Sequence, residues 1–215
     1  MNLFQEAAQL NNAGIDALIN GDSSSAIQSM TKAIKTMKAQ LAQSSTPNQK
    51  YDSSTAKASM DTHMVEVPTA SSDNIVVNQV VRIPIESTQE ISDFDMHVYS
   101  GAIIFNLALA HHFRSSSGNT SCMNKAEKLY SMVLKLLDNA SLNVHTALMV
   151  KLACINNLSQ IRYFKGDYDN AREGLSEVSH FMRHSPNKAI FEEQEIQGLL
   201  MNILLLKAPQ VAPAA

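Results

Sequence analysis

The stretch from Asn156 to Val178 constrains the fold more than any other part of the chain. Its apolar residues recur at helical spacing on either side of the dipeptide Gly166-Asp167. Glycine suits the left-handed position that ends many helices, and aspartate suits the N-cap of the helix that follows. The stretch therefore predicts two helices joined by a tight turn. One such pair cannot bury both of its apolar stripes, so we expect other pairs to stack against it.

The same periodicity predicts helices along most of the chain. Gly21-Asp22 separates the first two helices as Gly166-Asp167 separates a later pair, and a polar loop from Arg114 to Ser121 separates a third pair. The last helix is acidic in its first half, where the helix dipole favours acidic residues, and we expect it to cap the array. The predicted helices cover about residues 2–19, 22–41, 92–113, 122–138, 142–165, 168–184 and 187–207.

Between the second and third predicted helices the chain changes character. Residues 43–73 are rich in Ser, Thr, Asp and Lys and have no sustained apolar period, which indicates a solvated, flexible linker. Residues 75–85 are β-branched and predict a short strand, or a hairpin that turns at Asn78-Gln79. Three interpretations of this segment stay open: it packs along the helices, it lies in their groove as a built-in ligand mimic, or it pairs with a partner's strand.

These patterns divide the chain into four parts. Residues 1–42 form the first helical pair, and residues 43–91 form the linker with its extended segment. Residues 92–207 form two further pairs and the capping helix, and residues 208–215 form a disordered tail. The fold class that follows is all-α, with a long insertion.

The first helical pair, AGIDALINGDSSSAIQSMTKAI, resembles a tetratricopeptide repeat. That family has a small residue in its first helix, a Gly-Asp turn, and a small–large–small pattern in its second helix. In this chain those positions are held by Gly14, Gly21-Asp22, Ala26, Met30 and Ala33 in the first pair, by Ala108, Ala126, Tyr130 and Val133 in the second, and by Ser159, Gly166-Asp167, Ala171, Leu175 and Val178 in the third. The second pair lacks the Gly-Asp turn. The resemblance covers about residues 7–40 and 98–207, and it implies a right-handed array of helical pairs.

The resemblance also implies a binding surface. Such arrays usually offer their concave face, lined by the first helix of each pair, to a protein or peptide. The exposed positions in the first pair would be Asn11 and Ile15. The candidate peptide-binding groove in the later pairs consists of Phe105, Asn106, Leu109, His112, Asn156, Asn157, Gln160 and Tyr163. Asn106 and Asn157 take equivalent positions, where the family can hydrogen-bond a peptide backbone; the alternative is that both satisfy neighbouring backbone or polar groups.

One subclass of the family clamps a terminal carboxylate with lysine and arginine side chains. The corresponding positions here are Asn11 and Ile15 in the first pair and Ala153 and Asn157 in the third, so the cationic donors are absent. A buried carboxylate without such donors would be costly. We therefore expect no chaperone-type carboxylate clamp, and a groove that is polar and aromatic instead.

Other chemistries find little support. The net charge of −3 and the absence of a basic stripe argue against a nucleic-acid partner. His180 and His184 have the i, i+4 spacing of metal ligands but no further ligand beside them, and no nucleophile or phosphate-binding motif occurs. We expect no enzyme activity, no cofactor and no metal.

Cysteine usage and hydropathy suggest where the protein acts. Cys122 and Cys154 do not form a disulfide framework, which favours a reducing compartment. No signal peptide and no apolar run long enough for a membrane span is apparent, so we expect a cytoplasmic or nuclear protein without membrane insertion. The leading hypothesis is a non-catalytic adaptor or scaffold for a protein or peptide. A structural subunit of a larger assembly is the alternative, an RNA-binding helical repeat or an enzyme is less favoured, and self-association stays open.

Overall fold

The computed structural model describes residues 2–44, 63–68, 78–85, 93–115, 118–138 and 145–184, together with Leu199 and Ile203. Within these residues the protein is mostly α-helical, which confirms the coarse fold prediction. The helices are α1 (Leu3–Ile19), α2 (Ser23–Ser44), α3 (Asp93–Ser115), α4 (Thr120–Leu137), α5 (His145–Phe164) and α6 (Tyr168–His184). Their bounds lie close to those predicted from apolar periodicity.

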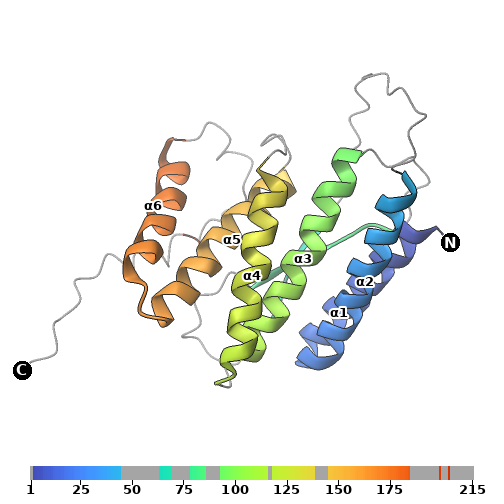
Figure 1. Ribbon diagram of the computed structural model, residues 1–215, viewed down its shortest axis with the longest axis horizontal. Helices are drawn as coiled ribbons and strands as arrows, with labels where there is room; N and C mark the ends of the chain where they lie inside the picture. The colour runs from blue at the N-terminus through green and yellow to red at the C-terminus, as the bar shows by residue number, and fades with distance from the viewer. Residues whose placement is uncertain are drawn as a thin grey trace, which may run out of the picture.

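The helices pack in the order in which they occur along the chain. Each helix contacts the next, from α1 to α6, and the strongest packing is within the pairs α1–α2, α3–α4 and α5–α6. Figure 1 shows this sequential arrangement, with α1 and α2 at one end and α6 at the other. Helix α3 also contacts both α1 and α5, so the odd-numbered helices share one side of the array. Helical pairs stacked in sequence are therefore established for the described part of the chain.

Local chemistry explains the tight turns. Gly21 and Gly166 have φ angles of 80° and 81°, in the left-handed region that glycine adopts without a steric cost. Asp22 then caps α2, because its Oδ1 accepts hydrogen bonds from the N–H groups of Ser24 and Ser25 at 3.1 and 3.0 Å. Hydrogen bonds from Ser25 lower the pKa of Asp22. The turn predicted at Gly166-Asp167 is confirmed.

A second use of glycine lies within α1. A Cβ atom added at Gly14 would come within 2.8 Å of the Met30 side chain and 3.2 Å of the Ala26 carbonyl oxygen. The small residue therefore permits the close approach of α1 and α2. In the α5–α6 pair, Ser159 and Gly174 are the small residues that permit close approach of the helices. A Cβ atom added at Gly174 would collide with the Ser159 hydroxyl.

The insertion contains a two-stranded antiparallel hairpin. Strand β1 (His63–Glu66) pairs with β2 (Gln79–Arg82), with Met64 opposite Val81 and Val65 opposite Val80. The predicted turn at Asn78-Gln79 is wrong, because β2 begins there. The solvated-linker interpretation of residues 43–73 is also wrong for 63–67, which are strand or lie beside it, with Val67 buried. Residues 45–62 and 69–77 lie outside the described residues.

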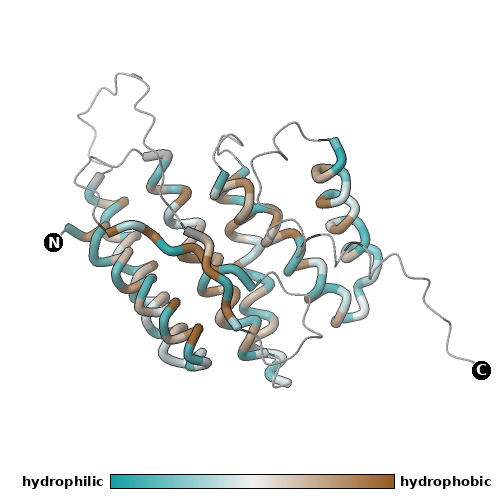
Figure 2. The backbone as a smooth tube through the Cα atoms, turned by 180° about the vertical axis from the view of Figure 1, so that it is seen from behind, coloured by the Kyte–Doolittle hydropathy of each residue, from teal (hydrophilic) through white to brown (hydrophobic). Residues whose placement is uncertain are grey.

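Strand β2 and Ile83, which directly follows it, contribute to the cores between the helices. Val81 belongs to an apolar cluster with Phe105 and Tyr130, Val80 to one with Ile15 and Leu109, and Ile83 to one with Phe4, Met96 and Tyr99. Figure 2, seen from behind, shows the extended segment crossing α1 and α3, which are the helices that β2 contacts. The hairpin therefore covers the shared side of the odd-numbered helices at the N-terminal end of the array.

The predicted capping helix is described at two positions. Leu199 and Ile203 are helical and buried, and both join the cluster that contains residues of α5 and α6. The rest of the predicted helix 187–207 and the predicted tail 208–215 lie outside the described residues. No helix in the part of the chain that the structure describes could cross a membrane.

Candidate functional site: an asparagine-lined face that holds a strand

Asn106 of α3 holds the main chain of Val81 through both ends of its side-chain amide. Its Oδ1 accepts a hydrogen bond from the Val81 N–H at 2.9 Å, and its Nδ2 donates to the Val81 carbonyl oxygen, also at 2.9 Å. Nδ2 donates in addition to Oδ1 of Asn11 at 2.9 Å, and Asn11 donates to the same Val81 carbonyl at 3.2 Å. Asn106, Asn11 and Val81 are fully buried, so water does not compete for these bonds.

Asn12 of α1 holds the main chain of Ile83 in the same way. Its Nδ2 donates to the Ile83 carbonyl oxygen at 2.8 Å, and its Oδ1 accepts from the Ile83 N–H at 3.1 Å. Two neighbouring odd-numbered helices thus hold Val81 of β2 and Ile83, which directly follows β2 and lies two positions further on. We call the surface of α1 and α3 around Asn11, Asn12 and Asn106 the asparagine face.

The strand register explains why these two residues are available. In an antiparallel pair, successive residues turn their N–H and C=O groups alternately toward and away from the neighbouring strand. The Val67 N–H donates to the Asn78 carbonyl at 2.9 Å, so Asn78 faces β1 and the alternation turns Val81 and Ile83 away from it. A primary amide offers the same donor and acceptor as a peptide group. The side chains of Asn12 and Asn106 therefore stand where a third strand would hydrogen-bond.

Side chains add selectivity to this main-chain recognition. Val81 and Ile83 are 0% and 1% exposed, in two different apolar clusters. Arg82, between them, forms an ion pair with Asp16 of α1, and its side chain is 31% exposed. The face thus accepts an aliphatic side chain, a basic one and a second aliphatic one in succession.

The sequence carries a signal for Asn12 in its spacing to a small residue. Asn12 precedes Gly14 by two residues, as Asn106 precedes Ala108 and Asn157 precedes Ser159. Each asparagine is thus placed identically relative to the small residue of its helix, which puts the three on equivalent sides of α1, α3 and α5. Sequence reasoning considered Asn11 and missed Asn12.

The predicted groove residues do not share one surface. The expectation that they are exposed is wrong for most of them and for Asn11 and Ile15, because the chain itself covers these positions. The buried members are Phe105, Asn106, Leu109, His112, Asn156 and Asn157, whereas Gln160 and Tyr163 are half-buried. Asn106 lies on the asparagine face and Leu109 in the cluster that contains Val80.

Three other predicted residues surround Tyr130 of α4. The Tyr130 hydroxyl accepts a hydrogen bond from Nδ2 of Asn157 at 3.2 Å and lies 3.4 Å from Nδ1 of His112. The Phe105 ring lies against the Tyr130 ring, with centroids 6.0 Å apart. We call His112, Tyr130 and Asn157 the tyrosine network. It joins α3, α4 and α5 in the interior and offers no surface to a ligand.

Burial governs the titration of the tyrosine network. Desolvation lowers the pKa of His112 to about 4, so the imidazole is neutral near pH 7. Desolvation also raises the pKa of Tyr130, against the opposing effect of its hydrogen bond from Asn157. The network is therefore uncharged, and it has the character of a structural core rather than of a catalytic group.

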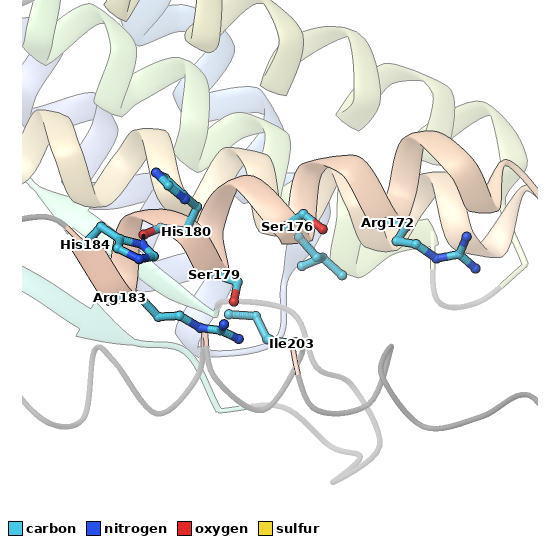
Figure 3. A pocket seen from close by; sticks show the side chains of 8 residues that line it. Arg172, Ser176, Ser179, His180, Arg183, His184 and Ile203 are labelled. Atoms are coloured by element: carbon cyan, nitrogen blue, oxygen red, sulfur yellow. Dashed lines mark hydrogen bonds between the residues drawn. The ribbon is translucent and has the colours of Figure 1, made fainter.

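The two histidines of α6 border a separate hollow. It has a volume of about 290 Å³ and is lined by Arg172, Leu175, Ser176, Ser179, His180, Arg183, His184 and Ile203. Figure 3 shows Arg183, Ser179 and Ile203 together, with Arg172 toward the other end of the helix. The rings of His180 and His184 stack with centroids 4.5 Å apart, and Nδ1 of His184 lies 3.0 Å from the His180 carbonyl oxygen. In the described ranges, no group of three His, Cys, Asp or Glu residues could hold a metal ion.

Exposed aromatic residues gather at the α5–α6 turn. Phe164 and Tyr168 are 62% and 47% exposed, and Tyr163 lies edge-on to both rings, with centroids 6.3 and 5.2 Å away. The predicted groove residue Tyr163 therefore belongs to this turn rather than to the asparagine face.

Cys122 and Cys154 are free and buried, and burial raises the pKa of the Cys154 thiol. Neither thiol is placed to act as an accessible nucleophile.

Comparison with known proteins gives no match, neither to a family model, nor to a curated protein, nor to a solved structure.

Proposed function

We propose that this protein is a non-catalytic adaptor that binds an extended segment of a partner protein on the asparagine face, in the manner of a tetratricopeptide-like array. The observation that carries the proposal is the pair of two-ended hydrogen bonds from Asn12 and Asn106 to a main chain. Such bonds recognise an extended backbone whatever its side chains, and each contributes about 1 kcal/mol when formed away from water.

The test is selection of peptides from a random library against the intact protein, followed by NMR mapping of the selected peptide. Binding should shift the side-chain amide signals of Asn12 and Asn106 and the backbone signals around them. Asn106→Leu should remove the binding, whereas Met132→Ala, on the exposed side of α4, should leave it unchanged. Shifts confined to α6 or to the α5–α6 turn would contradict the proposal.

The second candidate is a structural subunit of a larger assembly, and the exposed aromatic turn favours it. Aromatic residues are enriched in the central parts of protein interfaces, and Phe164 and Tyr168 are solvent-exposed in the isolated chain. If this function holds, the double change of Phe164 and Tyr168 to Ser should release an assembly purified with the wild-type chain. Asn106→Leu should not release it.

A further inference from the structure

We propose that β2 is an intramolecular competitor for the asparagine face, and that the partner which displaces it carries an aliphatic–basic–aliphatic sequence in extended conformation. This inference rests on the proposed function. It adds the chemistry of the ligand and the way in which access to the face is controlled.

The helices hold main-chain atoms that nearly any peptide offers. The asparagine amides contact the N–H and C=O groups of Val81 and Ile83, which every extended chain other than one with proline at those positions possesses. A second chain could therefore satisfy the same four main-chain groups on the face without any rearrangement of α1 or α3.

The side chains of the held segment indicate which residues a competing segment needs. The Val81 and Ile83 side chains enter two separate apolar clusters, so a competing segment needs aliphatic residues two positions apart. Asp16 lies beside the intervening position and pairs with Arg82 there. A basic residue between the two aliphatic ones is favoured at that position, and an acidic one is disfavoured by repulsion from Asp16.

The hairpin is short and is joined to the helices by long connections. Two strands of four residues each make a sheet that is marginal in water by itself, so the hairpin owes its order to the helices beneath it. Its connections are long, with 18 residues between Ser44 and His63 (positions 45 to 62) and nine between Ile83 and Asp93 (positions 84 to 92). Departure of β2 therefore breaks contacts with α1 and α3 without requiring either helix to unfold.

Competition by β2 lowers the apparent affinity of the face for a partner segment. If the face is free in a fraction of the molecules, the apparent affinity of a partner falls by that fraction. Minor states of this kind have populations of about 0.1–10%. Unseating β2 should then raise the affinity of a partner segment by about tenfold or more.

The experiment measures fluorescence anisotropy of a labelled peptide with the sequence of residues 78–85 as it binds to the intact chain. Ile83→Asp places a charge in an apolar site and unseats β2, yet leaves Asn12 and Asn106 in place. We expect this variant to bind the peptide at least tenfold more tightly than the wild-type chain. Met132→Asp, the same type of change at an exposed position, should bind like the wild type.

Two further measurements test whether the peptide binds at Asn106 and whether it needs a basic residue. Adding Asn106→Leu to the Ile83→Asp chain should abolish the binding. A peptide with aspartate in place of the arginine should bind at least tenfold more weakly than the parent peptide. Equal affinity for both peptides would overturn the proposed sequence preference.

The outcomes separate the inference from the function on which it rests. Equal peptide affinity for the wild-type and Ile83→Asp chains, with loss in Asn106→Leu, would overturn competition by β2 but preserve peptide binding on the face. Library-selected peptides that bind the face while the 78–85 peptide binds neither chain would overturn the ligand chemistry alone. Loss of all peptide binding in both chains would overturn the function and the inference together.

A measurement on the wild-type chain covers the case in which Ile83→Asp fails to fold. If β2 leaves the face without unfolding of the helices, the Val81 and Ile83 amide hydrogens should exchange with solvent at least 100-fold faster than the slowest amides of α3. Exchange of both sets at the same rate would mean that β2 opens only on global unfolding, and it would overturn the inference.

Discussion

Asn106 and Asn157 take the same position relative to the small residue of their helices, yet they do different things. Asn106 binds the main chain of Val81, at a place where a strand covers α3. Asn157 binds the hydroxyl of Tyr130, a side chain from within the helical array. The asparagine face and the tyrosine network thus use one residue type, placed alike, to bind the main chain of the insertion in one case and a side chain of the helical array in the other. The role of each asparagine therefore depends on the group that packs over it, which is β2 over Asn106 and Tyr130 over Asn157.

Of the changes considered for the two regions, removal of the side-chain amide at Asn106 should lower the free energy of unfolding most. Asn106→Leu leaves the buried Val81 N–H and the buried Oδ1 of Asn11 without this partner, whereas the Val81 carbonyl oxygen keeps its hydrogen bond from Asn11. A buried group left unsatisfied costs about 1–3 kcal/mol. We expect the free energy of unfolding, measured by urea denaturation, to fall by about 3 kcal/mol. Asn12→Leu, at a half-buried position, should cost about 1 kcal/mol. Equal losses for the two variants would contradict the difference in burial on which the comparison depends.

The two regions should also differ in their response to acid. His112 has its pKa lowered to about 4 by burial, against an ordinary value of 6.5, so the unfolded chain binds a proton more readily than the folded one. Stability is therefore present above pH 6.5 and is lost as the pH falls from there toward 4. Between pH 7.5 and pH 5 this residue should account for a loss of about 2 kcal/mol.

The check is urea denaturation at both pH values for the wild type and for His112→Gln. The glutamine variant should show a smaller loss of stability between pH 7.5 and pH 5. Asn106→Leu should keep the full pH dependence, because an amide does not titrate. An unchanged slope in His112→Gln would show that His112 is not the buried group that responds to acid.

Gly166 provides a reference outside both regions. Gly166→Val forces a β-branched residue into the left-handed conformation at φ 81° and should lower the free energy of unfolding by about 1.5 kcal/mol. The space beside Gly166 is open, so the effect reports backbone strain and not a clash. Thermal unfolding measures it, and an unchanged melting temperature would refute the strain argument.

The smallest effect is expected from the hydroxyl at the centre of the tyrosine network. Tyr130→Phe keeps the packing with Phe105 but removes the acceptor for Asn157, and should cost about 1 kcal/mol. Protection of the Val81 amide against hydrogen exchange should remain as in the wild type. Loss of that protection would mean that the two regions are coupled and cannot be treated as separate.

Much of the fold could be predicted because it depends on local patterns. Apolar spacing gave the helices, and the chemistry of Gly-Asp dipeptides gave the turns at Gly21 and Gly166. The sequence pattern did not predict strand β1, because His63–Glu66 is only four residues long. Its alternation is too short to be distinguished from loop sequence, and its order depends on pairing with a distant segment.

The candidate site was harder to predict for a related reason. Periodicity identifies the side of a helix on which Asn106 lies, but not what rests on that side. Exposure was expected for Ile15 and Leu109, whereas Val80 of the same chain joins their cluster and both are buried. Asn12 could have been found from its spacing to Gly14, which repeats at Asn106 and Ala108.

Side-chain amides hold the main chain of Val81 and Ile83, and amide hydrogen exchange tests this residue by residue. In the wild-type chain, the Val81 and Ile83 amides should be protected relative to an unstructured peptide. Asn106→Leu should accelerate exchange at Val81 more than at Ile83, and Asn12→Leu should do the reverse, because each asparagine accepts from one of these amides. Exchange of both amides at unstructured-peptide rates in the wild type would mean that the asparagine side chains do not hold this main chain.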